Sequence, residues 1–217
     1  MNKILSFAVV GLLTMAACTK ERITGSGATI TEDRATSNFT KVSTSGSTNI
    51  HITHGATFKV QVKGYENLIS YMETKVINNT LEIGYKNLVS IKNDNVEVFV
   101  TMPVLESINT SGSADVDVKG AFTGTGTLHV SISGSGNIDI ETGDAQLFKS
   151  SISGSGNIRA FGLVAQSADV SISGSGSTEV RATNHLKVGI SGSGFVYYKG
   201  QPVLETSISG SGRLVHR

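Results

Sequence analysis

Hydrophobic and polar residues alternate along most of this chain, and the alternation runs without a break through a recurring Gly-Ser-Gly. The segment "SISGSGNIDI", from Ser131 to Ile140, returns as "SISGSGNIRA" from Ser151 to Ala160. In both copies an apolar residue or a glycine occupies every second position, which is typical of strands that bury one face. A linker has no reason to keep this phase. The pattern therefore predicts a strand on each side of every Gly-Ser-Gly.

The spacing of the repeat indicates how these strands are arranged. Five copies recur at intervals of 20, 20, 18 and 18 residues, beginning at Gly134, Gly154, Gly174, Gly192 and Gly210. A fixed period near 20 residues is the mark of a solenoid in which each repeat is one coil. Divergent copies, "STSGSTNIHI" and "NTSGSADVDV", lie upstream and extend the coils to about 22 residues. We expect an all-β fold, a parallel β-helix or β-solenoid, forming one domain over residues 30–217.

The two kinds of position in the repeat have different expected roles. Glycines fall on the inward phase, where a tight corner excludes a Cβ atom and favours positive φ. The outward serines, such as Ser133, Ser153 and Ser173, are expected to form ladders with a step of about 4.8 Å. Such a ladder allows the hydroxyls to hydrogen-bond one another along the axis.

The region between the two divergent copies allows two interpretations. The 66 positions from Gly46 to Gly112 match three coils of 22 residues, but they also contain strand patterns separated by Asn-Asn and Asp-Asn turn signals. Residues 53–105 are thus either regular coils or a cap of antiparallel hairpins. Leu68 to Met72 is the one place where a short helix fits, and the polar stretch before Phe39 is expected to cap the N-terminal end.

The first residues predict export and lipid attachment. Lys3 precedes an apolar run too short to span a membrane, and "MAAC" resembles the lipobox of bacterial lipoproteins. We expect a signal peptide over residues 1–17, lipid on Cys18 and a flexible tether over residues 18–29. An ordinary secretory signal is the alternative. Because Cys18 is the only cysteine, no intramolecular disulfide can form.

Composition and charge narrow the range of partners. The formal net charge is +1 and no basic block occurs, so we expect no nucleic-acid partner. We expect no cofactor and no metal site, because the five histidines are scattered. The "GSGNIDI" turn is similar to calcium-binding repeats, but Asp139 is replaced by Arg159 and Glu179 in the next coils. An outward ladder of charges with Arg159 between two carboxylates is the better interpretation.

Outward side chains supply the candidates for binding and for catalysis. Four carboxylates on one predicted face, Asp115, Asp117, Asp139 and Glu179, resemble the acidic grooves of glycan-cleaving β-helices, but nothing in the sequence sets a catalytic separation between them. We therefore assign no catalytic residue. The candidate binding face comprises outward hydroxyl, amide and aromatic side chains: Ser133, Ser153, Ser173, Asn137, Asn157, Phe195 and Tyr197.

Longer motifs connect the chain to a known family. The repeated "SGSGNI", the upstream "F.KV..SGS.NI.I..G....V.V.G" and the central "VEV.VTMP.LESI..SGSADV" resemble the head GIN domain family of auto-transporter adhesins. The resemblance covers about residues 30–215. It implies a right-handed β-helix on exported, often lipid-anchored proteins of Gram-negative bacteria.

These observations lead to one functional hypothesis and two alternatives. We expect a non-catalytic lipoprotein of the outer membrane, on its cell-surface or periplasmic face, which binds a surface, a glycan or a protein. The alternatives are a β-helix enzyme that cleaves glycans with its outward carboxylates, and a structural envelope protein that associates with its own copies. An uncapped C-terminal coil leaves homo-oligomerisation open.

Overall fold

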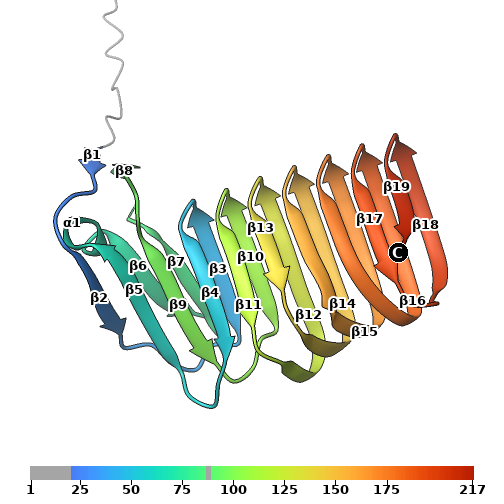
Figure 1. The fold of residues 1–217 in the computed structure, drawn as a ribbon, viewed down its shortest axis with the longest axis horizontal. Coiled ribbons are helices and arrows are strands. Elements are labelled where there is room, and N and C mark those ends of the chain that lie inside the picture. The colour runs from blue at the N-terminus through green and yellow to red at the C-terminus, as the bar shows by residue number, and fades with distance from the viewer. Residues whose placement is uncertain (1–20, 87–88) are drawn as a thin grey trace, which may run out of the picture.

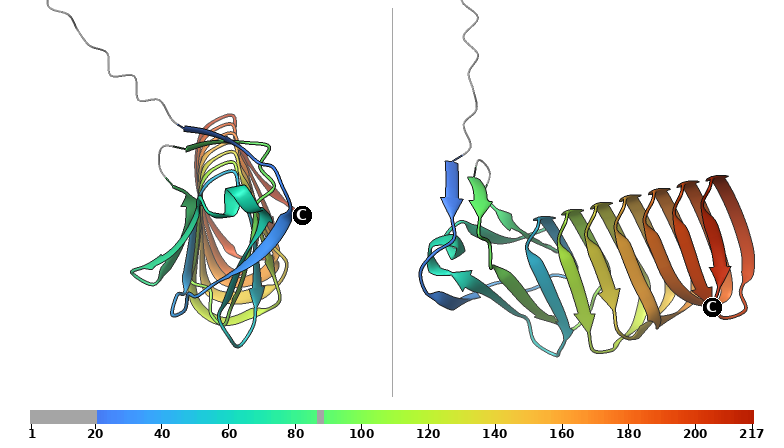
Figure 2. Two further views of the ribbon diagram at one scale, coloured as in Figure 1. Left: turned by 90° about the vertical axis from the view of Figure 1, so that its left-hand side faces the viewer. Right: turned by 45° about the horizontal axis from the view of Figure 1, so that its top comes forward.

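The protein folds as a β-solenoid capped at its N-terminal end (Figures 1 and 2). The computed structural model describes residues 21–86 and 89–217, so the predicted signal peptide and Cys18 lie outside the described residues. Strands lead into and leave each Gly-Ser-Gly corner, or the matching corner of the divergent copies, and β15 and β16 each run unbroken from one corner to the next. The strands of the coils are β3 (Lys41–Gly46), β4 (Asn49–His54), β10 (Ser107–Gly112), β11 (Asp115–Lys119), β12 (Phe122–Gly134), β13 (Asn137–Ile140), β14 (Gly143–Gly154), β15 (Asn157–Gly174), β16 (Ser177–Gly192), β17 (Phe195–Lys199), β18 (Val203–Gly210) and β19 (Arg213–His216).

Parallel pairing places equivalent residues of successive coils directly beside one another. Ile132 aligns with Ile152, which aligns with Ile172 and then with Ile190. All four side chains are buried in a continuous hydrophobic core. The predicted inward phase is therefore confirmed, and the interior is a stack of aliphatic layers.

The Gly-Ser-Gly corner has the tight geometry that the sequence predicted. Gly154 has a φ of +133°, and a Cβ built on it would lie 2.3 Å from the carbonyl oxygen of Gly134. A Cβ on Gly156 would lie 2.4 Å from the carbonyl oxygen of Gly136. Any side chain at these positions would collide with the backbone of the preceding coil.

The segment between the first two coils forms a hairpin cap and not three further coils. Strand β3 pairs directly with β10, and Gly46 aligns with Gly112. The cap strands β7 and β9 extend the two stacks by parallel pairing with β3 and β4, while β6 pairs antiparallel with β7, and β2 and β9 pair antiparallel with β5. Their bounds are β2 (Thr29–Arg34), β5 (Lys59–Tyr65), β6 (Met72–Ile77), β7 (Thr80–Tyr85) and β9 (Glu97–Met102).

Two smaller elements complete the cap. Helix α1 (Glu66–Ile69) overlaps the short helix expected at Leu68 to Met72, and it buries Leu68 and Ile69. Strand β1 (Glu21–Thr24) pairs in parallel with β8 (Val89–Lys92). The flexible tether predicted over residues 18–29 thus overlaps the folded region, because Ile23 packs against the core.

No helix among the described residues has the length and apolar character needed to cross a membrane.

Candidate functional site

The corner divides the outer surface of the solenoid into two faces. The strands that lead into each corner, β12 and β14 among them, pair with one another, and the strands that leave it, such as β11, β13 and the start of β15, form a separate stack. We call the first surface the serine face and the second the charged face. The sequence-based binding set is therefore split: Ser133, Ser153 and Ser173 lie on the serine face, and Asn137, Asn157, Phe195 and Tyr197 lie on the charged face.

The serine face is a regular but loosely connected surface. Ser133, Ser153 and Ser173 are exposed and aligned on neighbouring strands. Within residues 21–86 and 89–217, no hydrogen bond joins one of these serines to the next. Neighbouring strands lie about 4.8 Å apart, whereas two hydroxyl oxygens must approach to about 2.8 Å. The hydrogen bonds that such a ladder allows are therefore not formed between these serines, because equivalent hydroxyls stay about one strand spacing apart.

Asparagine side chains on the charged face are long enough to connect the coils. Asn137 Nδ2 donates to Asp115 Oδ1 at 2.7 Å, and Asn157 Nδ2 donates to Asn137 Oδ1 at 2.9 Å. Ser177 Oγ then donates to Asn157 Oδ1 at 2.7 Å. The ladder fixes these amide groups and holds four successive coils in register.

A row of charged side chains runs beside this ladder across adjacent strands. His51, Asp117, Asp139, Arg159 and Glu179 are successive partners in the register. Arg159 Nη1 donates to both carboxylate oxygens of Asp139, at 3.0 and 2.9 Å. This hydrogen bond raises the pKa of Arg159. The predicted position of Arg159 between two carboxylates is confirmed.

The row continues into the cap through His51. The Nδ1 atom of this histidine lies 3.1 Å from Asp117 Oδ2, and its Nε2 atom lies 3.4 Å from Glu97 Oε1. The ring also stacks on Phe99, with 4.9 Å between ring centroids. Sequence reasoning missed Glu97 and Phe99 because nothing in the repeat showed that strand β9 would lie next to β4.

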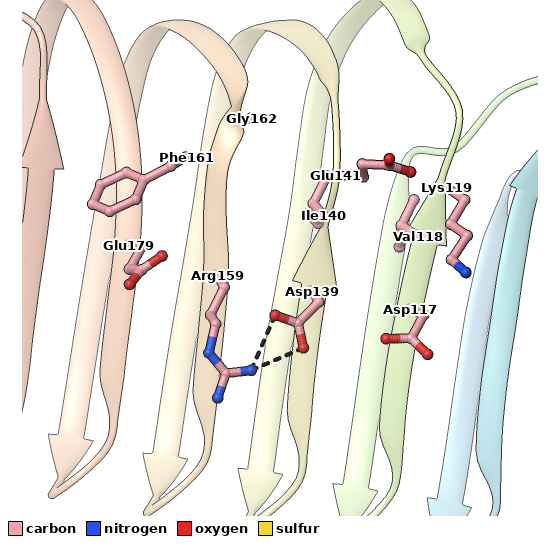
Figure 3. A pocket seen from close by; sticks show the side chains of 10 residues that line it. All are labelled: Asp117, Val118, Lys119, Asp139, Ile140, Glu141, Arg159, Phe161, Gly162 and Glu179. Atoms are coloured by element: carbon pink, nitrogen blue, oxygen red, sulfur yellow. Dashed lines mark hydrogen bonds and ion pairs between the residues drawn. The ribbon is translucent and has the colours of Figure 1, made fainter.

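A shallow groove with a volume of about 340 Å³ lies along this row (Figure 3). Charged residues form much of its lining, and the Phe161 ring extends toward Glu179 (Figure 3). Sequence reasoning did not single out Phe161, although it follows Arg159 on the same outward phase. The lining residues are Asp117, Val118, Lys119, Asp139, Ile140, Glu141, Arg159, Phe161, Gly162 and Glu179.

Two of the four carboxylates that line the groove are engaged with neighbouring side chains. Asp139 binds Arg159 and Asp117 contacts His51, whereas Glu141 and Glu179 form no ion pair with another described residue. In the part of the chain that the structure describes, no three His, Cys, Asp or Glu side chains are grouped as metal ligands. The groove therefore offers hydrogen-bonding partners and one aromatic surface to a ligand.

Aromatic and cationic side chains gather where the charged face reaches the last coils. Phe195 and Tyr197 lie on the outward phase, as predicted, because Val196 between them is fully buried. Their rings are nearly parallel, with centroids 6.1 Å apart. Lys199 Nζ lies 4.4 Å from the centroid of the Phe161 ring, and the Arg217 guanidinium lies 4.8 Å from that of Tyr197.

Comparison with known proteins identifies the class to which this solenoid belongs. Residues 38–202 match the family model described as "Putative auto-transporter adhesin, head GIN domain", and the chain belongs to this family. The resemblance seen in the sequence motifs is confirmed. The family description implies a protein of the cell envelope or surface. No curated protein matches the chain.

Several solved structures are similar to this chain over most of its length. A putative adhesin from Bacteroides fragilis is 25% identical, with a TM-score of 0.76 over 90% of this chain and 100% of that one. A putative lipid binding protein from Parabacteroides distasonis is also 25% identical, with a TM-score of 0.57 over 91% of this chain and 100% of that one. A putative adhesin from Parabacteroides merdae, at 22% identity, has a TM-score of 0.52 over 91% and 99% of the two chains.

Proposed function

We propose that this protein is a non-catalytic adhesin, anchored through lipid on Cys18 in the outer membrane of a Gram-negative bacterium. Its charged face binds a glycan or a protein on another surface. The observation that carries the proposal is the groove along the charged row, where ionic side chains and Phe161 lie together on a rigid sheet.

The chemistry of the groove suits a polar, extended ligand. Carboxylate and guanidinium groups pair with hydroxyls and amides, and the face of an aromatic ring covers the apolar side of a sugar or a side chain. The groove is shallow and follows neighbouring coils, whereas pockets for small molecules bury most of their ligand. Similarity to solved structures named as adhesins supports the same function.

The contacts of Asp117 and Asp139 favour binding over glycan cleavage by these two carboxylates. A cleaving pair needs one acid that holds a proton and a second, free carboxylate. Asp139 is instead tied to Arg159, and Asp117 contacts His51. Incubation of the purified protein with a panel of polysaccharides should release no reducing ends. Turnover that disappears in Asp139→Asn would establish the enzyme and refute the adhesin.

The location of the protein is tested by protease treatment of intact cells. We expect loss of the solenoid from intact cells, with the Cys18→Ser variant absent from the membrane fraction and unlabelled by radioactive palmitate. A solenoid that resists protease until the outer membrane is permeabilised would contradict surface adhesion. Membrane retention of unlabelled Cys18→Ser would contradict the anchor. These two readouts separate the anchor from the orientation of the protein.

A further inference from the structure

The charged face has opposite charge at its two ends. Near the cap its charged outward residues are mainly acidic, namely Glu97, Asp115, Asp117, Asp139 and Glu141, and Lys119 is the basic exception. In the last coils the charged outward residues are mainly basic, and Glu179 is the acidic exception. We call this second region the basic–aromatic end, and it consists of Arg181, Phe195, Tyr197, Lys199, Arg213 and Arg217.

Cations and aromatic rings alternate across the basic–aromatic end. Arg181 aligns with Lys199 on the next strand, and Phe195 aligns with Arg213. The four cationic side chains are exposed, and none of them forms an ion pair with another described residue. By contrast, Arg159 in the groove is neutralised by Asp139. The basic–aromatic end thus has positive charge available for a ligand.

Two of the four cations are already positioned by aromatic rings. Lys199 lies over Phe161 and Arg217 lies over Tyr197, which restricts the freedom of both long side chains. Phe195 is 37% exposed and stacks beside Tyr197. An incoming ligand therefore meets charges and ring surfaces that are partly ordered before binding.

We propose that the basic–aromatic end binds acidic glycans, that is, polysaccharides that carry carboxylate or sulfate groups. This inference deepens the proposed adhesin function and rests on it. Guanidinium groups bind carboxylates and sulfates with paired hydrogen bonds, and the exposed rings cover the C–H faces of sugar rings. Because the coils repeat about every 4.8 Å, the cations recur along the solenoid axis and suit a ligand whose acidic groups also repeat.

The position of this region favours a glycan over the anionic membrane to which the protein is tethered. Strand β1, which follows the lipidation site, lies at the cap, while β18 and β19 lie at the opposite end of the solenoid (Figure 1). Electrostatic attraction is screened within about 8 Å at physiological ionic strength, so the basic–aromatic end acts on what touches it directly. It points toward a partner away from the anchoring surface.

The test measures retention of the full-length, detergent-purified protein on immobilised alginate, a polyuronate, and on heparin, a sulfated glycan, with neutral dextran alongside. We expect binding to at least one acidic glycan, none to dextran, and elution by added salt. The triple variant Arg181→Ala, Lys199→Ala, Arg213→Ala should lose at least about ten-fold in affinity for the acidic glycan. The matched control removes three cations from the serine face, Lys41, Lys149 and Lys187, and should bind like the wild type.

The other possible results show whether the acidic-glycan inference fails alone or together with the adhesin function. Equal loss of binding in both triple variants would show that net charge alone acts, and would overturn the inference. Binding to dextran that is lost in Phe161→Ala would refute the acidic ligand but leave the adhesin function intact. Tight binding to vesicles of phosphatidylglycerol with none to either acidic glycan would assign the region to membranes. Binding to no glycan and to no protein-coated surface would refute both proposals.

Discussion

Arg159 and Asp139 stand on neighbouring coils, and one guanidinium nitrogen contacts both carboxylate oxygens of its partner at 3.0 and 2.9 Å. The two residues occupy the same position of consecutive repeats, 20 residues apart. Variation at one position of the repeat has therefore produced a cross-coil ion pair. The pair places a fixed, nearly neutral element in the middle of the groove, between the acidic and basic ends of the charged face.

This ion pair should contribute little to stability. Both side chains are about half exposed, so we expect Asp139→Asn or Arg159→Ala to lower the free energy of unfolding by less than about 1 kcal/mol. Urea unfolding of the two single variants and the double variant gives the coupling energy directly. A coupling above about 2 kcal/mol would show that the pair is structural and would weaken its assignment to ligand binding.

Substitution of a corner glycine should destabilise the protein far more than loss of this ion pair. Gly154→Ala requires a Cβ that would lie 2.3 Å from the Gly134 carbonyl oxygen, at a φ of +133°. We expect a loss of about 3 kcal/mol or more, or no folded protein. Gly189→Ala is the matched control, because a Cβ there meets no atom within 4 Å. Similar melting temperatures for the two variants would contradict the corner geometry.

The asparagine ladder predicts that alanine substitutions at two polar positions of the same repeat differ in their effect on stability. Asn157→Ala removes a hydrogen bond to Asn137 and another from Ser177, so it should cost about 1–2 kcal/mol. Ser153→Ala removes an exposed hydroxyl from the serine face and should change stability by less than about 0.5 kcal/mol. Chemical denaturation compares them. Equal effects would mean that the ladder does not fasten the coils.

A half-buried phenol in the cap predicts a loss of stability in alkali. Burial, and then the hydrogen bond that Tyr85 donates to Asp94 at 2.7 Å, raise the pKa of Tyr85 above its ordinary value of 10.0. Unfolded protein thus loses this proton at lower pH than folded protein does. The contribution of Tyr85 to the free energy of unfolding is therefore complete below pH 10 and declines above it. Tyr85→Phe should be less stable near neutral pH and decline less steeply between pH 9 and about 11. If the free energy of unfolding fell equally steeply with pH in the wild type and in Tyr85→Phe, Tyr85 would not be the cause of the decline.

The coils were predictable because their physics is local and repeated. Period-two alternation through Gly134 and Gly136 specified both strands and the corner, and five nearly equal copies specified the stacking. The positive φ angles at Asn78 and Asn79, 49° and 62°, likewise agree with the turn signal in the sequence.

The cap was not predictable in the same way. Alternation is identical in parallel and antiparallel strands, so it did not reveal that β5 reverses direction beside β9. A segment length equal to three coils also fitted the wrong arrangement. The candidate site was only partly predictable for a related reason: His51 meets Glu97 because β4 pairs with the cap strand β9, and Phe161 interacts with Lys199 from a later coil.

The most direct test of the adhesin account is adhesion of intact cells to surfaces coated with glycans and proteins. Cells that carry the wild-type chain should adhere more than cells that lack it. Phe161→Ala combined with Tyr197→Ala should abolish the difference, while Ser153→Ala combined with Ser173→Ala on the serine face should preserve it, at equal amounts of surface protein. Equal adhesion with and without the wild-type chain would contradict the account.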